Sequence, residues 1–174
     1  MLGSIRVATE NTTFAMPETG IGFFPDVGGG WFLPRLPGRL GVYLAMTGGR
    51  LNGADSCAVG LCDVYIPSER LDDAAEVLAT GEPTASRASV LGVLEVFAEK
   101  PPAAKITGLQ PQIDRLFAGE SVEEIFDALF KDESEDAQKW AKAMSGKSPT
   151  SLKVALEQLR RGKDLDLAGV LAMD

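Results

Sequence analysis

The stretch FAMPETGIGFFPDVGGG, residues 14–30, decides how this chain is interpreted. It is apolar over most of its length, yet it contains two carboxylates, Glu18 and Asp26, and it ends in three consecutive glycines. Glycine carries no side chain, so the backbone N–H groups of such a loop can approach a ligand closely. The composition therefore raises the question of whether the two acids serve a site or only the fold.

A catalytic interpretation follows from where the two acids stand. The glycines lead into an apolar run that predicts a helix, and the N-terminus of a helix favours an anion or a developing oxyanion. Glu18 follows a predicted strand, and an apolar surround would raise the pKa of its carboxyl, which suits acid–base chemistry. Asp26 stands eight residues further on and could hold a substrate hydroxyl or a water. The residues that would form the apolar surround are Phe14, Met16, Ile21, Phe23 and Phe24.

A purely structural interpretation fits the same stretch. Asp26 could cap the helix that starts at the glycines, Glu18 could be a solvated loop residue, and the aromatic residues could belong to the core. The glycine run is not a phosphate loop of the Walker type, because no Gly-Lys-Ser/Thr follows it. On the pattern alone, both interpretations stay open.

The composition excludes several classes of function. The chain has 174 residues, 45% of them hydrophobic and 24% charged, as expected for one soluble domain with a core. Its formal net charge of −8 argues against a nucleic-acid partner. No apolar run reaches the length of a membrane span, so we expect no membrane partner. A few Lys or Arg residues could still serve a phosphorylated small molecule.

The chain contains no histidine. This absence excludes Ser-His-Asp triads, Cys-His pairs and most zinc sites, so acid–base chemistry must use carboxylates, Lys, Tyr or Cys. Cys57 and Cys62 are expected to be small core residues of a protein in a reducing compartment.

The first hundred residues predict mixed secondary structure. Strands are expected over 5–9, 13–16 and 62–67. A helix over 39–48 should end at Gly48–Gly49, and a shorter helix should begin at the cap Asn52.

From residue 69 onward the pattern predicts helices almost exclusively, including one over 84–100 and one over 109–119. Ser121 and Glu124 form a capping-box pattern, and Ser148 is the expected cap of a helix with Pro149 at its first position. The composition shifts near residue 100, which divides the chain into two regions. A mixed region, 1–100, contains the acidic loop (residues 14–30), and a helical region, 101–174, follows.

The segment RVATENTTFAMPETGIGFFPDVGGGWFLPRLPGRLGVYLAMTG, residues 6–48, resembles the crotonase (enoyl-CoA hydratase/isomerase) superfamily. The motifs FAMPE, PDVGGG, LPRLPG and MTGGRLNGADSCAVGLCD stand in the family's order, and SPTSLKVALEQLRRG resembles its late helix. PDVGGG, with Asp26, is most similar to the branch that hydrolyses 3-hydroxyisobutyryl-CoA. The resemblance implies an α/β crotonase-type fold, a spiral of ββα turns, here a remnant with a mostly helical C-terminal region used in assembly.

The same resemblance implies a reaction and its residues. The family's acid–base glutamate corresponds to Glu18, and its second polar, substrate-binding group corresponds to Asp26. The implied activity is hydrolysis of a 3-hydroxyacyl-CoA thioester, with 3-hydroxyisobutyryl-CoA of valine breakdown as the expected substrate. Glu18 would act as nucleophile or as general base, and Asp26 would bind the substrate's hydroxyl. No metal or redox cofactor is expected, since coenzyme A enters only as part of the substrate.

Other residues of interest have a structural and a functional interpretation. Arg35 and Arg39 are expected as solvated arginines, with contact to the phosphates of coenzyme A as the alternative. Lys153 has the same two alternatives. Trp31 and Trp140 are expected in the core or in an interface.

Both ends of the sequence look cut, so we expect a piece of a longer protein. The family's N-terminal half would carry both oxyanion-hole donors and much of the coenzyme A pocket. Because one such donor is worth about 3 kcal/mol of barrier, we expect the piece alone to be nearly inactive.

Two other functions remain open at this point. One is an enoyl-CoA hydratase or isomerase that uses Glu18 with a glutamate from the missing half. The other is a non-catalytic module that forms homo-oligomers. The expected location is cytoplasmic for a bacterial source and mitochondrial for a eukaryotic one.

Overall fold

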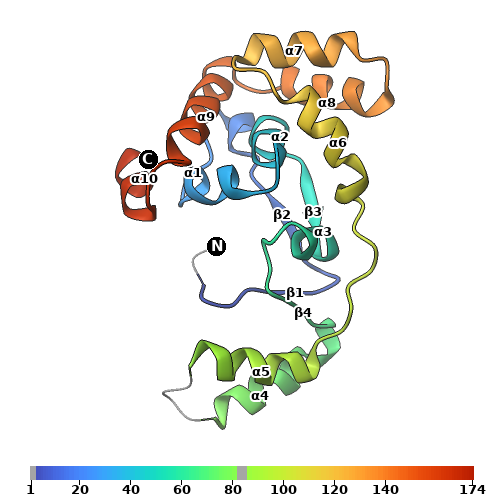
Figure 1. Ribbon diagram of the computed structural model, residues 1–174, viewed down its shortest axis with the longest axis vertical. Helices are drawn as coiled ribbons and strands as arrows, with labels where there is room; N and C mark the ends of the chain where they lie inside the picture. The colour runs from blue at the N-terminus through green and yellow to red at the C-terminus, as the bar shows by residue number, and fades with distance from the viewer. Residues whose placement is uncertain (1–2, 82–85) are drawn as a thin grey trace. The chain divides into compact units, whose positions relative to one another are not determined.

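The computed structural model describes residues 3–81 and 86–174 (Figure 1). Contacts divide the chain into two compact units, each discontinuous in sequence. Unit 1 comprises Met1–Phe14 and Leu51–Thr107, and unit 2 comprises Ala15–Arg50 and Gly108–Asp174. These units group residues 15–50 with the helical region, whereas the sequence analysis divided the chain at residue 100, and that linear division stays a prediction. Within the described ranges, no helix has the length and apolar character to span a membrane.

Unit 1 contains a parallel strand pair. β1 (Val7–Ala8) pairs with β4 (Val64–Tyr65), with Val7 opposite Val64. A 3-10 turn (Ser68–Arg70) leads into α4 (Leu71–Ala79), and α4 packs against α5 (Arg87–Phe97). The core of these elements consists of Val64, Ile66, Ala74 and Leu94. Both predicted strands, over 5–9 and 62–67, are therefore confirmed, although each is shorter than predicted.

A capping box organises the remaining part of unit 1. Asn52 ends β3 (Arg50–Asn52), and its side chain accepts a hydrogen bond from the Asp55 N–H at 2.8 Å, capping α3 (Gly53–Ala58). The Asp55 carboxylate accepts from the N–H groups of Asn52, at 3.4 Å, and of Ile106, at 3.0 Å. The predicted cap at Asn52 is confirmed. β3 itself, which pairs with β2 (Thr13–Ala15), was not predicted.

Unit 2 is built of helices around the buried α2 (Leu40–Thr47). Figure 1 shows α9 (Pro149–Gly162) running beside α2 and α1 (Gly29–Phe32). The other elements are a 3-10 turn (Leu33–Arg35), α6 (Ile106–Leu116), which begins in unit 1, α7 (Val122–Lys131), α8 (Glu135–Ser145) and α10 (Leu167–Met173).

An aromatic cluster fills the middle of unit 2. The ring centroid of Tyr43 lies 5.4 Å from that of Phe117 and 5.2 Å from that of Trp140, both in edge-on geometry. Edge-on aromatic pairs add stabilisation beyond their buried area. Trp140 is buried, which confirms its predicted place in the core.

The predicted helix ends are mostly confirmed. α2 ends at Gly48, whose φ of 68° lies in the left-handed region that favours glycine. Ser148 caps α9 through the Ser151 N–H. Ser121 caps α7 through the Glu124 N–H, but the Glu124 carboxylate accepts from the N–H of Glu120 and not from that of Ser121. The predicted capping box is therefore formed only in part, since the hydrogen bond back from Glu124 reaches the residue before the cap.

Two helix boundaries differ from the prediction. α6 begins at Ile106, three residues before the predicted start, and the N–H of Ile106 donates to the Asp55 carboxylate at 3.0 Å. α5 covers Arg87–Phe97, and its cap Ser86 accepts from the Ser89 N–H at 3.2 Å. Residues 84 and 85 of the predicted helix lie outside the described residues.

Candidate active site

The segment that carries Glu18 is a fixed 3-10 turn (Glu18–Ile21) of unit 2. Thr19 is 0% exposed, and its hydroxyl donates to the Ala45 carbonyl of α2 at 3.2 Å. The Thr19 carbonyl accepts from the N–H of Ser148, the cap of α9, at 3.0 Å. The buried helix α2 and the N-terminus of α9 therefore both hold the turn that carries Glu18.

The Glu18 carboxylate is partly withdrawn from water. Its Oε2 atom is buried and has no hydrogen-bond partner among the described residues. Burial raises the pKa of the Glu18 carboxyl, its own backbone N–H offsets part of that shift, and the charge of Asp26 raises the pKa further. A carboxylate of this kind binds a proton more readily than an ordinary one, and that is the direction of shift that acid–base chemistry by a carboxylate requires.

Asp26 stands in a strained turn. Its carbonyl accepts from the Gly29 N–H at 2.8 Å, while Val27 and Gly28 have φ values of 50° and 82°. A valine at positive φ is unfavourable, and such strain is concentrated at functional positions. The Asp26 side chain makes no hydrogen bond or ion pair with any described residue, and α1 has no side-chain cap. The alternative that Asp26 caps this helix is therefore wrong.

The two predicted acids interact electrostatically. The charge of Asp26 acts on the Glu18 carboxyl, and neither acid forms an ion pair with a described Lys or Arg. Two interacting acids in different surroundings tend to divide the roles of proton acceptor and polar anchor. The arrangement can accept a proton at Glu18 and accept a hydrogen bond at Asp26.

The predicted apolar surround forms only in part. Met16 is buried, and Phe24 stacks on Phe23 with ring centroids 4.5 Å apart. Ile21 is 85% exposed and Phe23 is 44% exposed, so these side chains do not cover Glu18.

The glycine run serves packing and not an open backbone surface. Gly28, Gly29 and Gly30 are all buried. A methyl group on Gly29 would lie 2.8 Å from Cβ of Pro25, and one on Gly30 would lie 3.0 Å from Cγ of Gln158. α1 has only four residues, so it offers little helix dipole. The expectation that this run presents N–H groups to an anion is therefore wrong.

Arg35 has a structural role. Its guanidinium donates to the carbonyls of Trp31, Gly162 and Leu165, at 2.6, 3.1 and 2.8 Å, and it lies over the Trp31 ring at 4.6 Å. The bond to Gly162 satisfies a carbonyl at the end of α9, and the others tie α1 to the segment that follows α9. Lys153 forms an ion pair with Glu123 at 2.6 Å.

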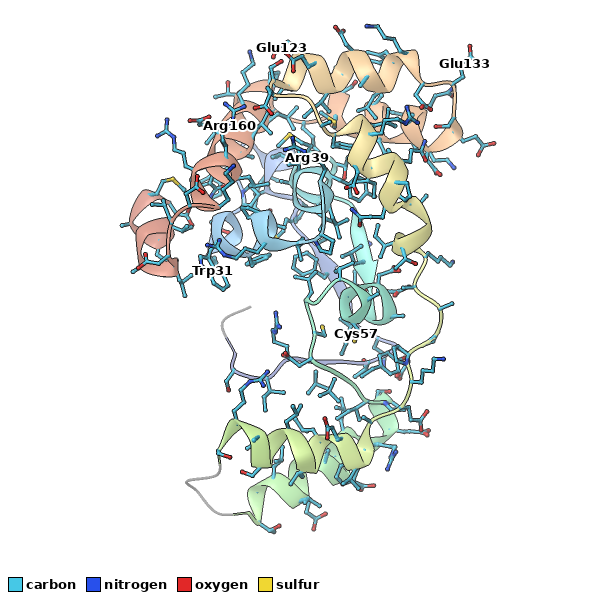
Figure 2. All side chains as sticks on the ribbon, viewed as in Figure 1. Trp31, Arg39, Cys57, Glu123, Glu133 and Arg160 are labelled. Carbon is cyan, nitrogen blue, oxygen red and sulfur yellow. The ribbon has the colours of Figure 1, made fainter. Side chains whose placement is uncertain are left out.

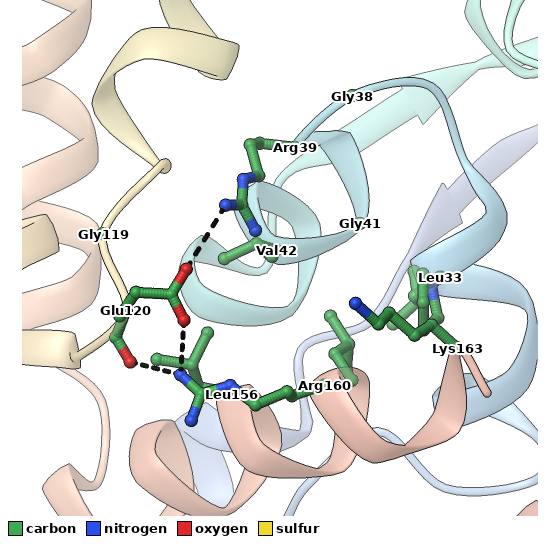
Figure 3. Close-up of a pocket in the computed structure, with 12 residues that line it drawn as sticks. Leu33, Gly38, Arg39, Gly41, Val42, Gly119, Glu120, Leu156, Arg160 and Lys163 are labelled. Atoms are coloured by element: carbon green, nitrogen blue, oxygen red, sulfur yellow. Dashed lines mark hydrogen bonds and ion pairs between the residues drawn. The ribbon is translucent and has the colours of Figure 1, made fainter. Parts of the chain in front are cut away.

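Arg39 lines a hollow of about 280 Å³ in unit 2, together with Arg160 and Lys163 (Figure 3). Arg39 directly precedes α2, and Arg160 lies on α9 (Figure 2). Glu120 forms ion pairs with both arginines, at 3.7 and 3.1 Å. Exposed ion pairs of this kind contribute little to stability. Contact of Arg35, Arg39 or Lys153 with the phosphates of coenzyme A stays a prediction.

The two cysteines lie in unit 1. Both are free and half-buried, with Cys57 on α3 (Figure 2). Burial raises the pKa of Cys57, and it raises that of Cys62 to about 11. Thiols with raised pKa are poor nucleophiles near neutral pH. The reducing compartment stays a prediction.

Sequence analysis missed three residues around the loop. Thr19 is an ordinary-looking threonine whose burial has no local signal. Lys147 lies against the same turn, with its Nζ 3.2 Å from where a methyl group on Gly20 would stand. Gln158 is a buried polar residue on the apolar stripe of α9, and this mismatch was visible in the sequence.

A family model described as enoyl-CoA hydratase/isomerase matches residues 1–174. Three similar curated proteins are named 3-hydroxyisobutyryl-CoA hydrolase, mitochondrial. The chain is 44% identical to the one from Xenopus laevis, 46% to the one from Danio rerio and 43% to the one from Homo sapiens. Each alignment covers 99% of this chain and 46% of the relative. The chain thus spans about half the length of these relatives.

Solved structures agree with the expected fold. A carnitinyl-CoA dehydratase from Mycobacterium thermoresistibile has a TM-score of 0.88 and 37% identity, covering 97% of this chain and 48% of its own. An enoyl-CoA hydratase from Rhodobacter sphaeroides 2.4.1 has a TM-score of 0.84 and 32% identity, covering 97% and 47%. The expected crotonase-type fold with a mostly helical C-terminal region is confirmed.

Proposed function

Because this chain belongs to the enoyl-CoA hydratase/isomerase family along its whole length, we propose that the complete protein hydrolyses a 3-hydroxyacyl-CoA thioester, with 3-hydroxyisobutyryl-CoA as substrate. The names of the relatives support the substrate. The observation that carries the chemistry is the Oε2 atom of Glu18, which is buried, has no hydrogen-bond partner among the described residues and lies within electrostatic reach of Asp26.

Glu18 supplies the reactive carboxylate in either of two ways. As nucleophile, one of its oxygens bonds to the thioester carbonyl carbon, the C–S bond breaks, and the coenzyme A thiolate leaves and takes up a proton. Water then cleaves the resulting anhydride and restores Glu18. As general base, Glu18 removes a proton from the water that attacks the same carbon. An oxygen without a partner is available for either role.

Asp26 provides selectivity for the hydroxylated acyl chain. Its carboxylate is not occupied by any described residue, so it can accept a hydrogen bond from the 3-hydroxyl group. A site built to bind a hydroxyl discriminates against chains that lack one, because its polar group is then left unpaired.

A hydratase or dehydratase is the second candidate, favoured by the names of the similar solved structures. In that case Glu18 would move a proton to or from the acyl chain, and no thiol would be released. The two activities differ in what the product contains, so one preparation can be assayed for both.

The test uses the complete protein. With 3-hydroxyisobutyryl-CoA, release of free thiol is the expected result, and it should be lost in Glu18→Gln. With crotonyl-CoA, loss of the enoyl absorbance without thiol release would instead support the hydratase. Thiol release by Glu18→Gln near the wild-type rate would contradict the role of Glu18.

The remaining expectations are proposals about the complete protein. The 174-residue chain alone should show little activity, and it should self-associate in light scattering only if the helical region serves assembly. The relatives reported above are named mitochondrial, which gives no support to a cytoplasmic location and agrees with the expectation for a eukaryotic source.

A further inference from the structure

Gln158 is out of place on the helix that carries it. Its neighbours on the inner face of α9 are apolar and buried, namely Leu152, Ala155, Leu156 and Leu159, and Gln158 itself is only 6% exposed. Glutamine is seldom buried, because its amide has four hydrogen-bonding positions to satisfy. Its presence there calls for a specific partner.

The partner is the acidic loop. The Gln158 amide nitrogen, Nε2, donates to the Pro25 carbonyl at 2.7 Å and to Oδ1 of Asp174 at 2.7 Å. Both partners are acceptors, so the nitrogen must be the atom that faces them, and the orientation of the amide is fixed. Pro25 is the residue directly before Asp26.

The same helix also fixes the other side of the turn. The Gln158 side chain occupies the space where a methyl group on Gly30 would stand, and a methyl group on Gly162 would collide with the Gly30 carbonyl. Between these contacts lie Asp26 and Val27, with Val27 at its strained φ of 50°. A strained turn keeps its conformation only when the surrounding structure holds it.

The amide oxygen of Gln158 indicates that packing alone does not explain a glutamine at this position. Its Oε1 is buried and has no hydrogen-bond partner among the described residues. An apolar side chain of similar size, such as methionine, would fill the same place without a buried unpaired acceptor. Methionine could make neither of the two bonds that the amide nitrogen donates, to the Pro25 carbonyl and to Asp174. Only the first of these reaches the loop that carries Asp26.

We propose that Gln158 is a positioning residue, which directs the Asp26 carboxylate toward the 3-hydroxyl group of the substrate by holding the Pro25 carbonyl. The inference rests on the proposed function, since it gives Asp26 the hydroxyl-binding role. Gln158 acts through Asp26 and does not touch the reacting atoms. Its effect is therefore on selectivity between hydroxylated and unsubstituted acyl chains.

The test compares two substrates with the complete protein, 3-hydroxyisobutyryl-CoA and isobutyryl-CoA. Gln158→Met should lower kcat/KM for the hydroxylated substrate by about fivefold to tenfold, the loss expected for one hydrogen bond. It should leave kcat/KM for the unsubstituted substrate nearly unchanged. The matched control is Glu157→Gln, a half-buried position on the same helix whose carboxylate pairs with Arg160 and Arg161. The ratio of its two kcat/KM values should equal that of the wild type.

Three results would overturn the inference. Equal losses for both substrates in Gln158→Met would mean that the residue serves only the fold. An unchanged ratio in Gln158→Met, alongside a collapsed ratio in Asp26→Ala, would remove Gln158 and leave the role of Asp26 intact. An unchanged ratio in Asp26→Ala would remove the proposed role of Asp26 and the inference with it.

A second variant keeps the test decisive if Gln158→Met does not fold. Gln158→Asn retains the amide but draws it back by one methylene, so it should weaken the bond to Pro25 and lower the selectivity ratio in the same direction. A folded Gln158→Asn with wild-type selectivity would count against the inference.

Discussion

Asp55 in unit 1 and Glu18 in unit 2 are both withdrawn from water, and they differ in what their oxygens contact. Asp55 is 6% exposed, and its two oxygens accept from the N–H groups of Ile106 and Asn52. Glu18 has a buried oxygen with no partner among the described residues. Buried polar groups in native proteins are almost always paired. The difference indicates that Asp55 maintains the fold, and it agrees with the proposed role of Glu18 toward a group that the described residues do not supply.

The largest expected effect concerns activity at Glu18. In the complete protein, Glu18→Gln should lower thioester hydrolysis by about a hundredfold to ten-thousandfold, the range for loss of a proton-transferring group. Its melting temperature should be equal to or higher than that of the wild type, because the variant no longer buries a carboxylate. A Glu18→Gln variant that loses stability but keeps its turnover would contradict this, because Glu18 would then serve the fold as Asp55 does.

Asp55 should show the opposite pattern. Asp55→Ala leaves two backbone N–H groups without their acceptor and removes half of a capping box, which should lower the unfolding free energy by about 2–4 kcal/mol. Turnover per folded molecule should change little. Denaturant titration with activity measured on the folded fraction checks both, and Asp72→Ala, on the exposed side of α4, is a matched control.

Gly162 tests the scaffold behind the acidic loop. Because a methyl group there would meet the backbone of Gly30, which cannot give way as a side chain does, Gly162→Ala should destabilise the protein by about 1–3 kcal/mol. Gly92→Ala is the control, since a methyl group on Gly92 has no neighbour within 4 Å. Equal melting temperatures for the two variants would show that α9 does not hold the loop as described.

The smallest expected effect is in the pH dependence of stability. Since the folded protein raises the pKa of Glu18, it binds the proton more tightly than the unfolded chain does. The Glu18 contribution to the unfolding free energy should therefore fall as pH rises from the unfolded pKa through the higher folded value. The difference between the wild type and Glu18→Gln should be smallest in acid and largest above the folded pKa, and a difference that grows toward acid would contradict this sign.

Local signals predicted much of the fold. Side-chain caps such as Asn52 and Ser148, and glycine stops such as Gly48, act within one turn, so sequence alone identifies them. Contacts distant in sequence were not accessible in the same way. β3 depends on its pairing with β2. At the early start of α6, the N–H of Ile106 is satisfied by the carboxylate of Asp55, more than fifty residues away.

The sequence predicted the two acids of the candidate site but not the residues that hold their loop in place. Glu18 and Asp26 were identified, and the structure places them within electrostatic reach of each other, while their roles stay proposals. The glycines after Asp26 were misinterpreted as an open ligand surface, because a sequence does not reveal that α9 packs against them. Gln158 could have been noticed as a polar residue on an apolar stripe, but its partner Pro25 lies 133 residues away.

The central claim is that Glu18 is a partly buried carboxylate whose pKa is raised by burial and by the charge of Asp26. The most direct measurement is the pKa of the Glu18 side chain, followed by NMR of a 13C-labelled carboxyl group in the complete protein and in its Asp26→Asn variant. The account predicts a pKa above the ordinary glutamate value in the wild type and a lower one in the variant. An ordinary pKa that does not move when Asp26 loses its charge would contradict it.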